Sequence, residues 1–313
     1  MSSATTGRMA GLAAWKAVVR RDPRAAAGAF LLLAFALVAI FGPMLVGDPQ
    51  AMVGVPLQPP SWQHWLGTTG QGQDVLAQLV VGTRVSLSLG FLVGVAVVSI
   101  GALVGVAAGY FGGRIDAGLS LLFNVFLVLP GLPLAIVIAA YLPSGPRTVA
   151  LVLIVTGWAW NARVVRAQAS SLRQRDFVAA AVVSGESDAR IITQEILPML
   201  SSLLLAQVIG STTYAIGAQV GLEFLGLGDV AAVSWGTNLY WAQNDSALLT
   251  GAWWTFAPTG VCIALVGTAL SLLNSGFDEM SNPRLSVEHP WRAFLAARGQ
   301  VPARSTPVVR EHD

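Results

Sequence analysis

Charged residues are scarce in this chain of 313 residues: Asp, Glu, Lys and Arg make up 11% of it, whereas soluble domains carry roughly 25%. Hydrophobic residues make up 54%, and the mean hydropathy is +0.65. This balance excludes an ordinary soluble domain and predicts an all-α membrane protein, because about 20 apolar residues in a helix span a bilayer. The formal net charge of +2 gives no indication of nucleic-acid binding.

Cysteine and histidine are also scarce. The single cysteine, Cys262, excludes an internal disulfide and a cysteine cluster, and its apolar surroundings predict a packing role. The three histidines, His64, His289 and His312, show no metal-ligand spacing. We therefore expect no metal and no cofactor in this chain.

The cores of the apolar segments contain no Asp, Glu, Lys, Arg or His, and the chain lacks a nucleotide-binding P-loop motif. Ion-coupled carriers generally need an ionisable group at membrane depth, and a membrane hydrolase needs a nucleophile with a base, or a metal. The sequence therefore predicts a non-catalytic chain. If it moves a solute uphill, the energy must come from another chain.

Six apolar segments are candidate membrane spans. The first has 22 apolar residues, more than the roughly 7–15 of a cleavable signal sequence, so we expect it to be retained. Pro130 and Pro133 predict a kink or break in the third. The fourth has only 14 residues before Arg163, so its end must be tilted or covered by protein. The predicted spans are 25–46, 84–110, 117–141, 149–162, 199–222 and 252–277.

The six spans belong to one membrane domain at 25–285. One polar segment precedes this domain, one lies within it and one follows it. Residues 1–24 fit either an amphipathic helix on the membrane surface or an unstructured basic tail. Residues 163–198 form a polar excursion with two short helical runs, the second of which is expected to end at Ile196-Leu197-Pro198. Residues 286–313 are predicted to be a disordered tail.

The basic residues lie almost entirely on one side of these spans. Sixteen of the 18 fall in the N-terminal segment, the turn at 111–116, the excursion at 163–195 and the tail. Only Arg84 and Arg147 lie on the other side, in or near loops that hold most of the tryptophans. The positive-inside rule therefore places both termini and the excursion in the cytoplasm.

Small and polar residues mark particular helix faces. Glycines at 90/94 and 101/105/109 predict that another helix approaches closely, in preference to any chemical role. Gln207, Ser211 and Tyr214 share one helical face because they are spaced i, i+4 and i+7. Hydrogen bonds between helices and the lining of a polar pathway both fit this face. Asn124, expected as the buried polar residue of its span, is a further pathway candidate.

Four segments carry a resemblance to a known family: HWLGTTGQGQDVLAQLVVGTRVSL, WNARVVRAQASSLRQRDFVAAAVVSGESDARIITQEILP, EFLGLGDVAAVSWGTNL and FDEMSNPRL. The chain, from about Trp15 to Leu285, resembles the inner-membrane permeases of ABC importers, specifically the second or C-type permease of dipeptide and oligopeptide systems. The resemblance implies a type I ABC importer permease fold. It also implies three kinds of partner: a second homologous permease, two ATPase subunits that bind ATP and Mg, and an extracytoplasmic binding protein that delivers peptide.

The resemblance further implies that the excursion is a coupling loop seated in a groove of one ATPase; an ordinary solvated loop is the alternative. The family's loop usually opens Glu-Ala-Ala, whereas this chain has alanine at all three positions, so the usual acidic contact is absent and Asp176, Glu186 and Asp188 are the candidates to replace it. The candidate coupling residues are Asp176, Phe177, Ala179, Ala180, Ala181, Gly185, Glu186, Asp188 and Arg190.

Two loops on the opposite side, 48–82 and 223–251, are predicted to dock the binding protein; exposed linkers are the alternative. Candidate docking residues are Trp65, Asp74, Glu223 and Trp235. The same fold also serves importers of nickel, haem or glycosides. Outside the class of ABC permeases, the chain could be a channel, an ion-driven carrier or a membrane scaffold. The subunits that co-purify with the chain distinguish these functions from that of an ABC permease.

Overall fold

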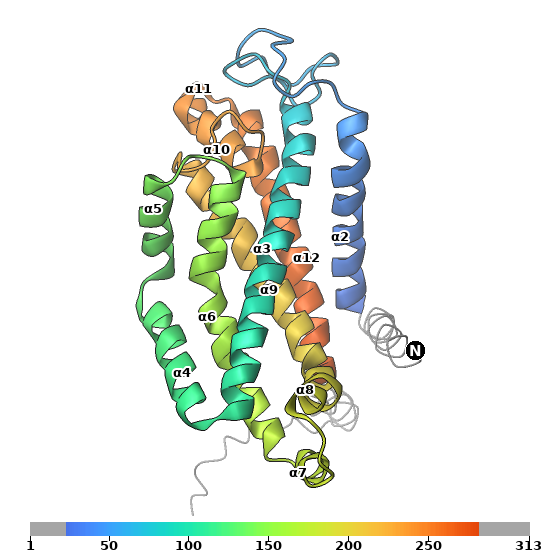
Figure 1. The fold of residues 1–313 in the computed structure, drawn as a ribbon. Helices are drawn as coiled ribbons and strands as arrows, with labels where there is room; N and C mark the ends of the chain where they lie inside the picture. Colours follow the sequence, from blue (N-terminus) through green and yellow to red (C-terminus); the bar gives the residue numbers. More distant parts are fainter. Residues whose placement is uncertain (1–22, 282–313) are drawn as a thin grey trace, which may run out of the picture.

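The computed structural model describes residues 23–281, so the predictions for the N-terminal segment and the tail lie outside the described residues. Long helices run side by side along the molecule (Figure 1), with a loop at 45–74 at one end and the short helices α7 and α8 at the other. In the described range, five helices are long and apolar enough to span a membrane, or six if one bent pair counts as a span. This confirms the predicted all-α membrane fold.

The helices are α2 (Pro23–Phe41), α3 (Val75–Phe111), α4 (Gly113–Val128), α5 (Gly131–Tyr141), α6 (Pro146–Arg173), α7 (Asp176–Val183), α8 (Asp188–Arg190), α9 (Leu197–Phe224), α10 (Trp235–Asn244), α11 (Ala247–Thr250) and α12 (Ala257–Ser281). Single turns add η1 (Gly42–Met44), η2 (Ile191–Ile196) and η3 (Trp253–Thr255).

Helix α3 is the central element and has 37 residues. It begins at Val75 because the side chain of Asp74 caps it, accepting a hydrogen bond from the backbone N–H of Ala77 at 2.9 Å. The span predicted from residue 84 is therefore part of a longer continuous helix.

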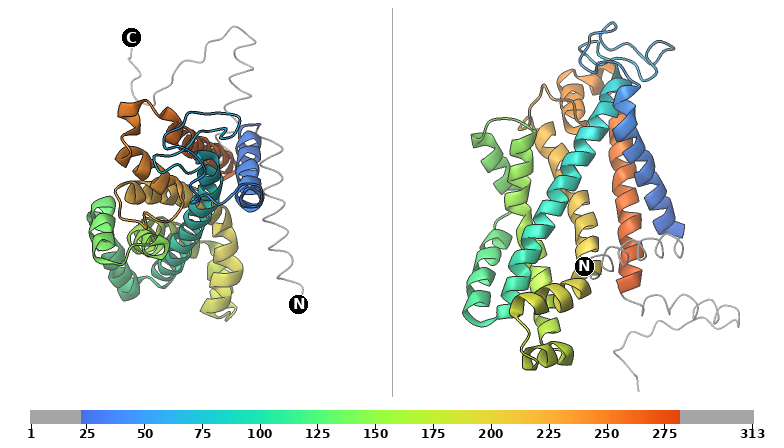
Figure 2. Two further views of the ribbon diagram at one scale, coloured as in Figure 1. Left: turned by 90° about the horizontal axis from the view of Figure 1, so that it is seen from above. Right: turned by 45° about the vertical axis from the view of Figure 1, so that its right-hand side comes forward.

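The glycines of α3 let it approach two neighbours closely, as their spacing predicts. Gly90 and Gly94 face α9, where a methyl group added at Gly94 would lie 2.9 Å from the backbone nitrogen of Thr212. Gly101, Gly105 and Gly109 face α6. The views in Figure 2 show α2 lying along α12 on one side of this core, with α4 and α5 on the other.

The proline-containing span is broken, as predicted. Helices α4 and α5 meet at an angle of 85°, and Pro130 between them has extended backbone. A proline fixes its own φ, donates no backbone hydrogen bond and disfavours helical geometry in the residue before it. The chain therefore turns sharply within the span.

Two other predictions were wrong in detail. The fourth span is not short, because α6 has 28 residues and continues past Arg163 to Arg173. Arg166 in this extension donates two hydrogen bonds to the carboxylate of Asp116 in α4, which ties the extension to the bundle. The excursion between the helices consequently begins after α6, around residue 174.

The second helical run of the excursion does not end before Pro198. Helix α8, the π-helical turn η2 and α9 follow one another without a gap, as one continuous helical stretch from Asp188 to Phe224. A proline inside an α-helix removes one hydrogen bond and collides with the carbonyl group four residues earlier. The wider π-turn at Ile191–Ile196 directly precedes this proline, so the helical stretch continues past Pro198 without a break.

Candidate functional site

A cavity of about 450 Å3 lies among α3, α4, α6 and α9. Gln207, Ser211 and Tyr214 of α9 all line it, so the structure brings these three pathway candidates together. The remaining lining residues are Val93, Val97, Leu127, Leu153, Thr156, Gly157, Trp160, Asn161 and Gly210. The cavity is thus a mostly apolar space with a polar face, and no charged residue lines it.

Asn161 of α6 is a lining residue that the sequence reasoning missed. Its side chain is 4% exposed, and its Nδ2 donates a hydrogen bond to Ser211 Oγ at 3.1 Å, which joins α6 to α9. An amide within the apolar run before Arg163 was the available signal. Asn161 lies inside the span predicted at 149–162, but sequence alone does not show that its side chain faces α9.

Gln207 has no comparable partner. Both polar atoms of its side chain are hidden from solvent and lack a hydrogen-bond partner among the described residues. A hidden amide without partners costs free energy and requires a physical explanation. Among the polar residues that line the cavity, only Gln207 has this property.

The prediction that Asn124 is the buried polar residue of its span was wrong, and its pathway role stays a prediction. Its side chain is exposed on α4 and does not line the cavity, while its neighbour Phe123 is the residue that packs inside. Because α4 lies on the outside of the bundle, only a narrow face of it is buried (Figure 1).

At one end of the molecule, α7 lies exposed below the bundle (Figure 1). Val178 is its one buried residue and packs into a core cluster with Ile191 and Ile196. The helix presents apolar side chains outward as well, since Val182 is 56% and Val183 88% exposed. The candidate coupling residues that are exposed are Asp176, Phe177, Ala179, Ala180, Gly185, Asp188 and Arg190; Ala181 and Glu186 are half-buried.

Gly185 ends α7 in a backbone conformation that favours glycine, with φ of +78°. The N–H of Glu186 donates to the carbonyl oxygen of Ala181 at 3.1 Å, and that of Gly185 donates to Val182 at 3.0 Å. This is the Schellman arrangement that closes a helix C-terminus. Gly185 is therefore required for the shape of the turn, not for close contact, since a Cβ there would meet nothing within 4 Å.

The excursion after α6 is attached to the bundle by polar contacts. Tyr110 of α3 donates its hydroxyl hydrogen to Asp188 Oδ1 at 2.7 Å. The guanidinium of Arg173 in α6 lies 5.1 Å from the centre of the Tyr110 ring and bonds the backbone carbonyl of Tyr110. Arg190 lies 3.6 Å from Glu186 within the segment itself. Asp188 and Glu186 are thus engaged within the chain, which leaves Asp176 as the acidic group best placed for an external contact.

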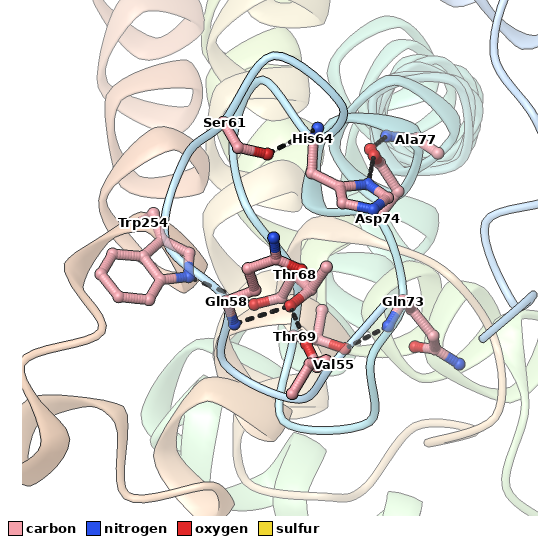
Figure 3. A network of polar contacts seen from close by, with 10 residues as sticks. All are labelled: Val55, Gln58, Ser61, His64, Thr68, Thr69, Gln73, Asp74, Ala77 and Trp254. Carbon is pink, nitrogen blue, oxygen red and sulfur yellow. Dashed lines mark hydrogen bonds and ion pairs between the residues drawn. The ribbon is translucent and has the colours of Figure 1, made fainter. Parts of the chain in front are cut away.

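At the opposite end, the loop at 45–74 has a defined shape (Figure 3). Thr68 is its centre: its hydroxyl donates to the carbonyl of Val55 at 2.6 Å and accepts from the N–H of Gln58 at 2.8 Å. Trp254 donates its indole N–H to the carbonyl of Thr68 at 3.2 Å, so the loop is attached to the segment before α12. The loop is therefore an ordered surface.

The docking candidates in this loop differ in kind. Trp65 is exposed, and Trp62 beside it is 97% exposed. Asp74 caps α3 and lies 3.0 Å from His64 Nδ1 (Figure 3), so its side chain has a structural role within the chain. The docking role of Trp65 stays a prediction.

The prediction that Glu223 and Trp235 lie on a docking surface was wrong. Glu223 is 4% exposed and accepts hydrogen bonds from Ser234 Oγ at 2.5 Å and from Gln219 Nε2 at 3.1 Å. Trp235 is fully buried, and its backbone N–H donates to Ser86 Oγ at 3.1 Å. The segment at 223–251 is not a plain loop, because α10 folds back onto α9 and α3.

The chain is similar to known proteins over most of its length. It is 33% identical over 279 residues to the dipeptide transport system permease protein of Bacillus subtilis (strain 168), which covers 87% of this chain and 85% of the relative. It is 31% identical to the protein of the same name from Alkalihalophilus pseudofirmus, over 85% of this chain and 88% of the relative.

It is also 34% identical to the oligopeptide transport system permease protein of Mycobacterium bovis, over 72% of this chain and 78% of the relative. Residues 101–287 match the model of a family described as the inner membrane component of binding-protein-dependent transport systems. The match covers more than half of the chain and includes α4 to α12. The chain therefore belongs to the family of binding-protein-dependent transport system inner membrane components.

Proposed function

We propose that this permease subunit imports dipeptides or oligopeptides and forms half of their translocation pathway. The observation that carries the proposal is the similarity to a dipeptide permease over 87% of the chain. The relatives described above are named for dipeptide or oligopeptide transport, which favours peptide over nickel, haem or a glycoside as the substrate. The cavity among α3, α4, α6 and α9 is the part of the pathway that this chain contributes.

The energy for transport comes from separate ATPase subunits, which bind ATP and Mg, and this chain has no catalytic role. The α7 end of the molecule faces the cytoplasm, as do both termini, because the basic residues concentrate on that side. The exposed apolar pair Val182 and Val183 supports docking on a partner, since apolar side chains in water are favourable to cover.

Movement of α7 reaches the membrane through the contacts of Tyr110. A push on α7 and α8 is passed to α3 by the Tyr110–Asp188 hydrogen bond, and Arg173 couples α6 to the same point. Helix α3 runs from there to the loop at 45–74, the full length of the bundle (Figure 1). Such a rigid element transmits a small displacement to a bundle that has two packed arrangements.

A soluble binding protein docks at the opposite end, on the ordered loop at 45–74. Trp62 and Trp65 supply exposed aromatic anchors of the kind that dominate protein interfaces. A second, homologous permease subunit completes the pathway, and the lipid bilayer surrounds the pair in the inner membrane.

Purification of the tagged chain from its own host tests this proposal. We expect a second permease and ATPase subunits to co-purify in stoichiometric amounts. Vesicles that contain this complex should accumulate labelled dipeptide or oligopeptide when ATP and the binding protein are supplied. ATP-driven uptake of nickel, haem or a glycoside in place of peptide would overturn the substrate, and a complex without an ATPase would overturn the mechanism.

A further inference from the structure

The polar face of the cavity is made of amides and hydroxyls alone. Gln207, Ser211 and Tyr214 follow one another along one face of α9, and Asn161 of α6 is hydrogen-bonded to Ser211. Asn161 and Ser211 are paired by two hydrogen bonds, of 3.1 and 3.4 Å, whereas both polar atoms of the Gln207 side chain are hidden and have no partner among the described residues. An amide in this state gains free energy from any ligand that supplies one donor and one acceptor.

We propose that Gln207 binds the main-chain amide of the transported peptide, with the Asn161–Ser211 pair beside it. This inference rests on the proposed function and specifies how the substrate is held during passage. A side-chain amide carries one carbonyl acceptor and an N–H donor group, which matches the N–H and C=O that every peptide unit presents. Turning the Gln207 side chain into the cavity brings both of its polar groups to the peptide.

The rest of the lining explains why the main chain is the part recognised. The cavity has no charged lining residue, so neither the peptide termini nor charged side chains find an opposite charge there. Its walls, which include Val93, Val97, Leu153 and Trp160, are apolar and do not select among side chains by hydrogen bonding. A site of this kind holds peptides of different sequence, and its volume of about 450 Å3 lies within the roughly 300–1,000 Å3 of small-molecule sites.

The test compares two substrates that differ by a single hydrogen-bond donor. The complete complex in vesicles, with ATP and binding protein, is supplied with trialanine or with trialanine that is methylated on the backbone nitrogen of its second residue. We expect Gln207→Leu to lower the preference for trialanine over the methylated peptide by about 2–10-fold, the effect of one neutral hydrogen bond. Preferences that originate in the binding protein cancel, because the same binding protein serves both variants.

Thr213→Val is the matched control. Thr213 lies on the same helix, its hydroxyl donates to the carbonyl of Ile209 at 3.0 Å, and it does not line the cavity. This variant should keep the wild-type preference. Gln207→Met, which has a similar shape and no hydrogen-bonding group, is the second variant if the leucine variant fails to assemble with its partners.

Each outcome has a separate meaning. A reduced preference in the Gln207 variants, with an unchanged preference in Thr213→Val, supports main-chain recognition. Active uptake with an unchanged preference in the Gln207 variants overturns this inference and leaves the proposed function standing. Failure of the wild-type complex to take up either peptide overturns the proposed function, and the inference falls with it.

Discussion

At the residue scale, a buried carboxyl group holds together the end of the bundle where α9 meets α10. Glu223 lies in the last turn of α9 and accepts hydrogen bonds from Gln219 of the same helix and from Ser234, the N-cap of α10. Ser234 also completes a capping box with Thr237. A single acidic side chain thus joins the end of one membrane helix to the start of the next helix.

We therefore expect Glu223→Leu to destabilise the purified subunit by about 1–3 kcal/mol, because it removes one acceptor of the Ser234 hydroxyl and leaves the side-chain N–H group of Gln219 buried without its partner. Thermal unfolding in detergent measures this. Glu223→Gln keeps the shape and part of the hydrogen bonding, so its loss should be smaller. An unchanged unfolding temperature in the leucine variant would show that these bonds contribute nothing.

Individual residues were the level at which the sequence predicted least. Glu223 and Trp235 follow an apolar segment, so they read as loop residues, and no local pattern indicates that the chain folds back to bury them. Asn124 sits in an apolar run and reads as buried, but the exposed face of an outer helix depends on tertiary packing. Gln207, Ser211 and Tyr214 were grouped correctly because helical spacing alone places them on one face.

At the element scale, small residues decide how helices meet. The glycine spacing of α3 predicted close packing, but it gave no indication that Gly90 and Gly94 would pack against α9 and the glycines at 101, 105 and 109 against α6. The partner depends on the whole arrangement of helices, which spacing within one helix does not contain. The prolines show the same limit of sequence-based prediction. Pro130 lies at a break between two helices, whereas Pro198 is accommodated by a π-turn that no sequence pattern predicted.

Replacing Gly105 tests the packing of α3 on α6. A methyl group there would lie 2.6 Å from the carbonyl oxygen of Ala162 and 2.8 Å from Val165 Cβ, so Gly105→Val must push the helices apart. Overpacking of this kind typically costs about 1–3 kcal/mol. We expect a lower unfolding temperature and less assembled complex.

The matched control for this change is Gly118→Val. Gly118 is an exposed position of α4, where an added Cβ meets nothing within 4 Å. Its unfolding temperature should stay at the wild-type value. Equal effects of the two valine substitutions would contradict the account of the α3–α6 interface.

The turn after α7 gives a second test at this scale. Gly185→Val forces a β-branched residue into the left-handed region, which reshapes the helix end without a clash. We expect the complex to assemble but ATP hydrolysis to proceed with several-fold less peptide uptake, measured as the ratio of peptide transported to ATP hydrolysed in vesicles.

Gly251→Val is the control for the backbone strain itself. Gly251 has φ of +73° and equally open surroundings, but it follows α11 at the other end of the molecule. This variant should retain the wild-type transport ratio. If Gly185→Val also retained it, the shape of the α7 end would have no part in coupling.

At the scale of the whole molecule, the two ends differ in the elements and side chains that they expose. One end carries the exposed helix α7 and most of the arginines of residues 23–281, and the other carries the ordered loop at 45–74 (Figure 1) with the exposed Trp62 and Trp65. The sequence predicted this polarity well, because the distribution of charge along the chain is a one-dimensional property. The number and class of the apolar helices were predictable for the same reason.

The claim that force enters at α7 from the cytoplasm is tested most directly by site-directed labelling. In a Cys262→Ser background, which removes the only native thiol, cysteines are placed at Val182 in α7 and at Thr250 in α11. We predict that Val182→Cys cross-links to an ATPase subunit and resists an impermeant maleimide added outside intact cells, whereas Thr250→Cys is labelled and does not cross-link. Labelling of Val182→Cys from outside, with no cross-link to an ATPase, would contradict the account.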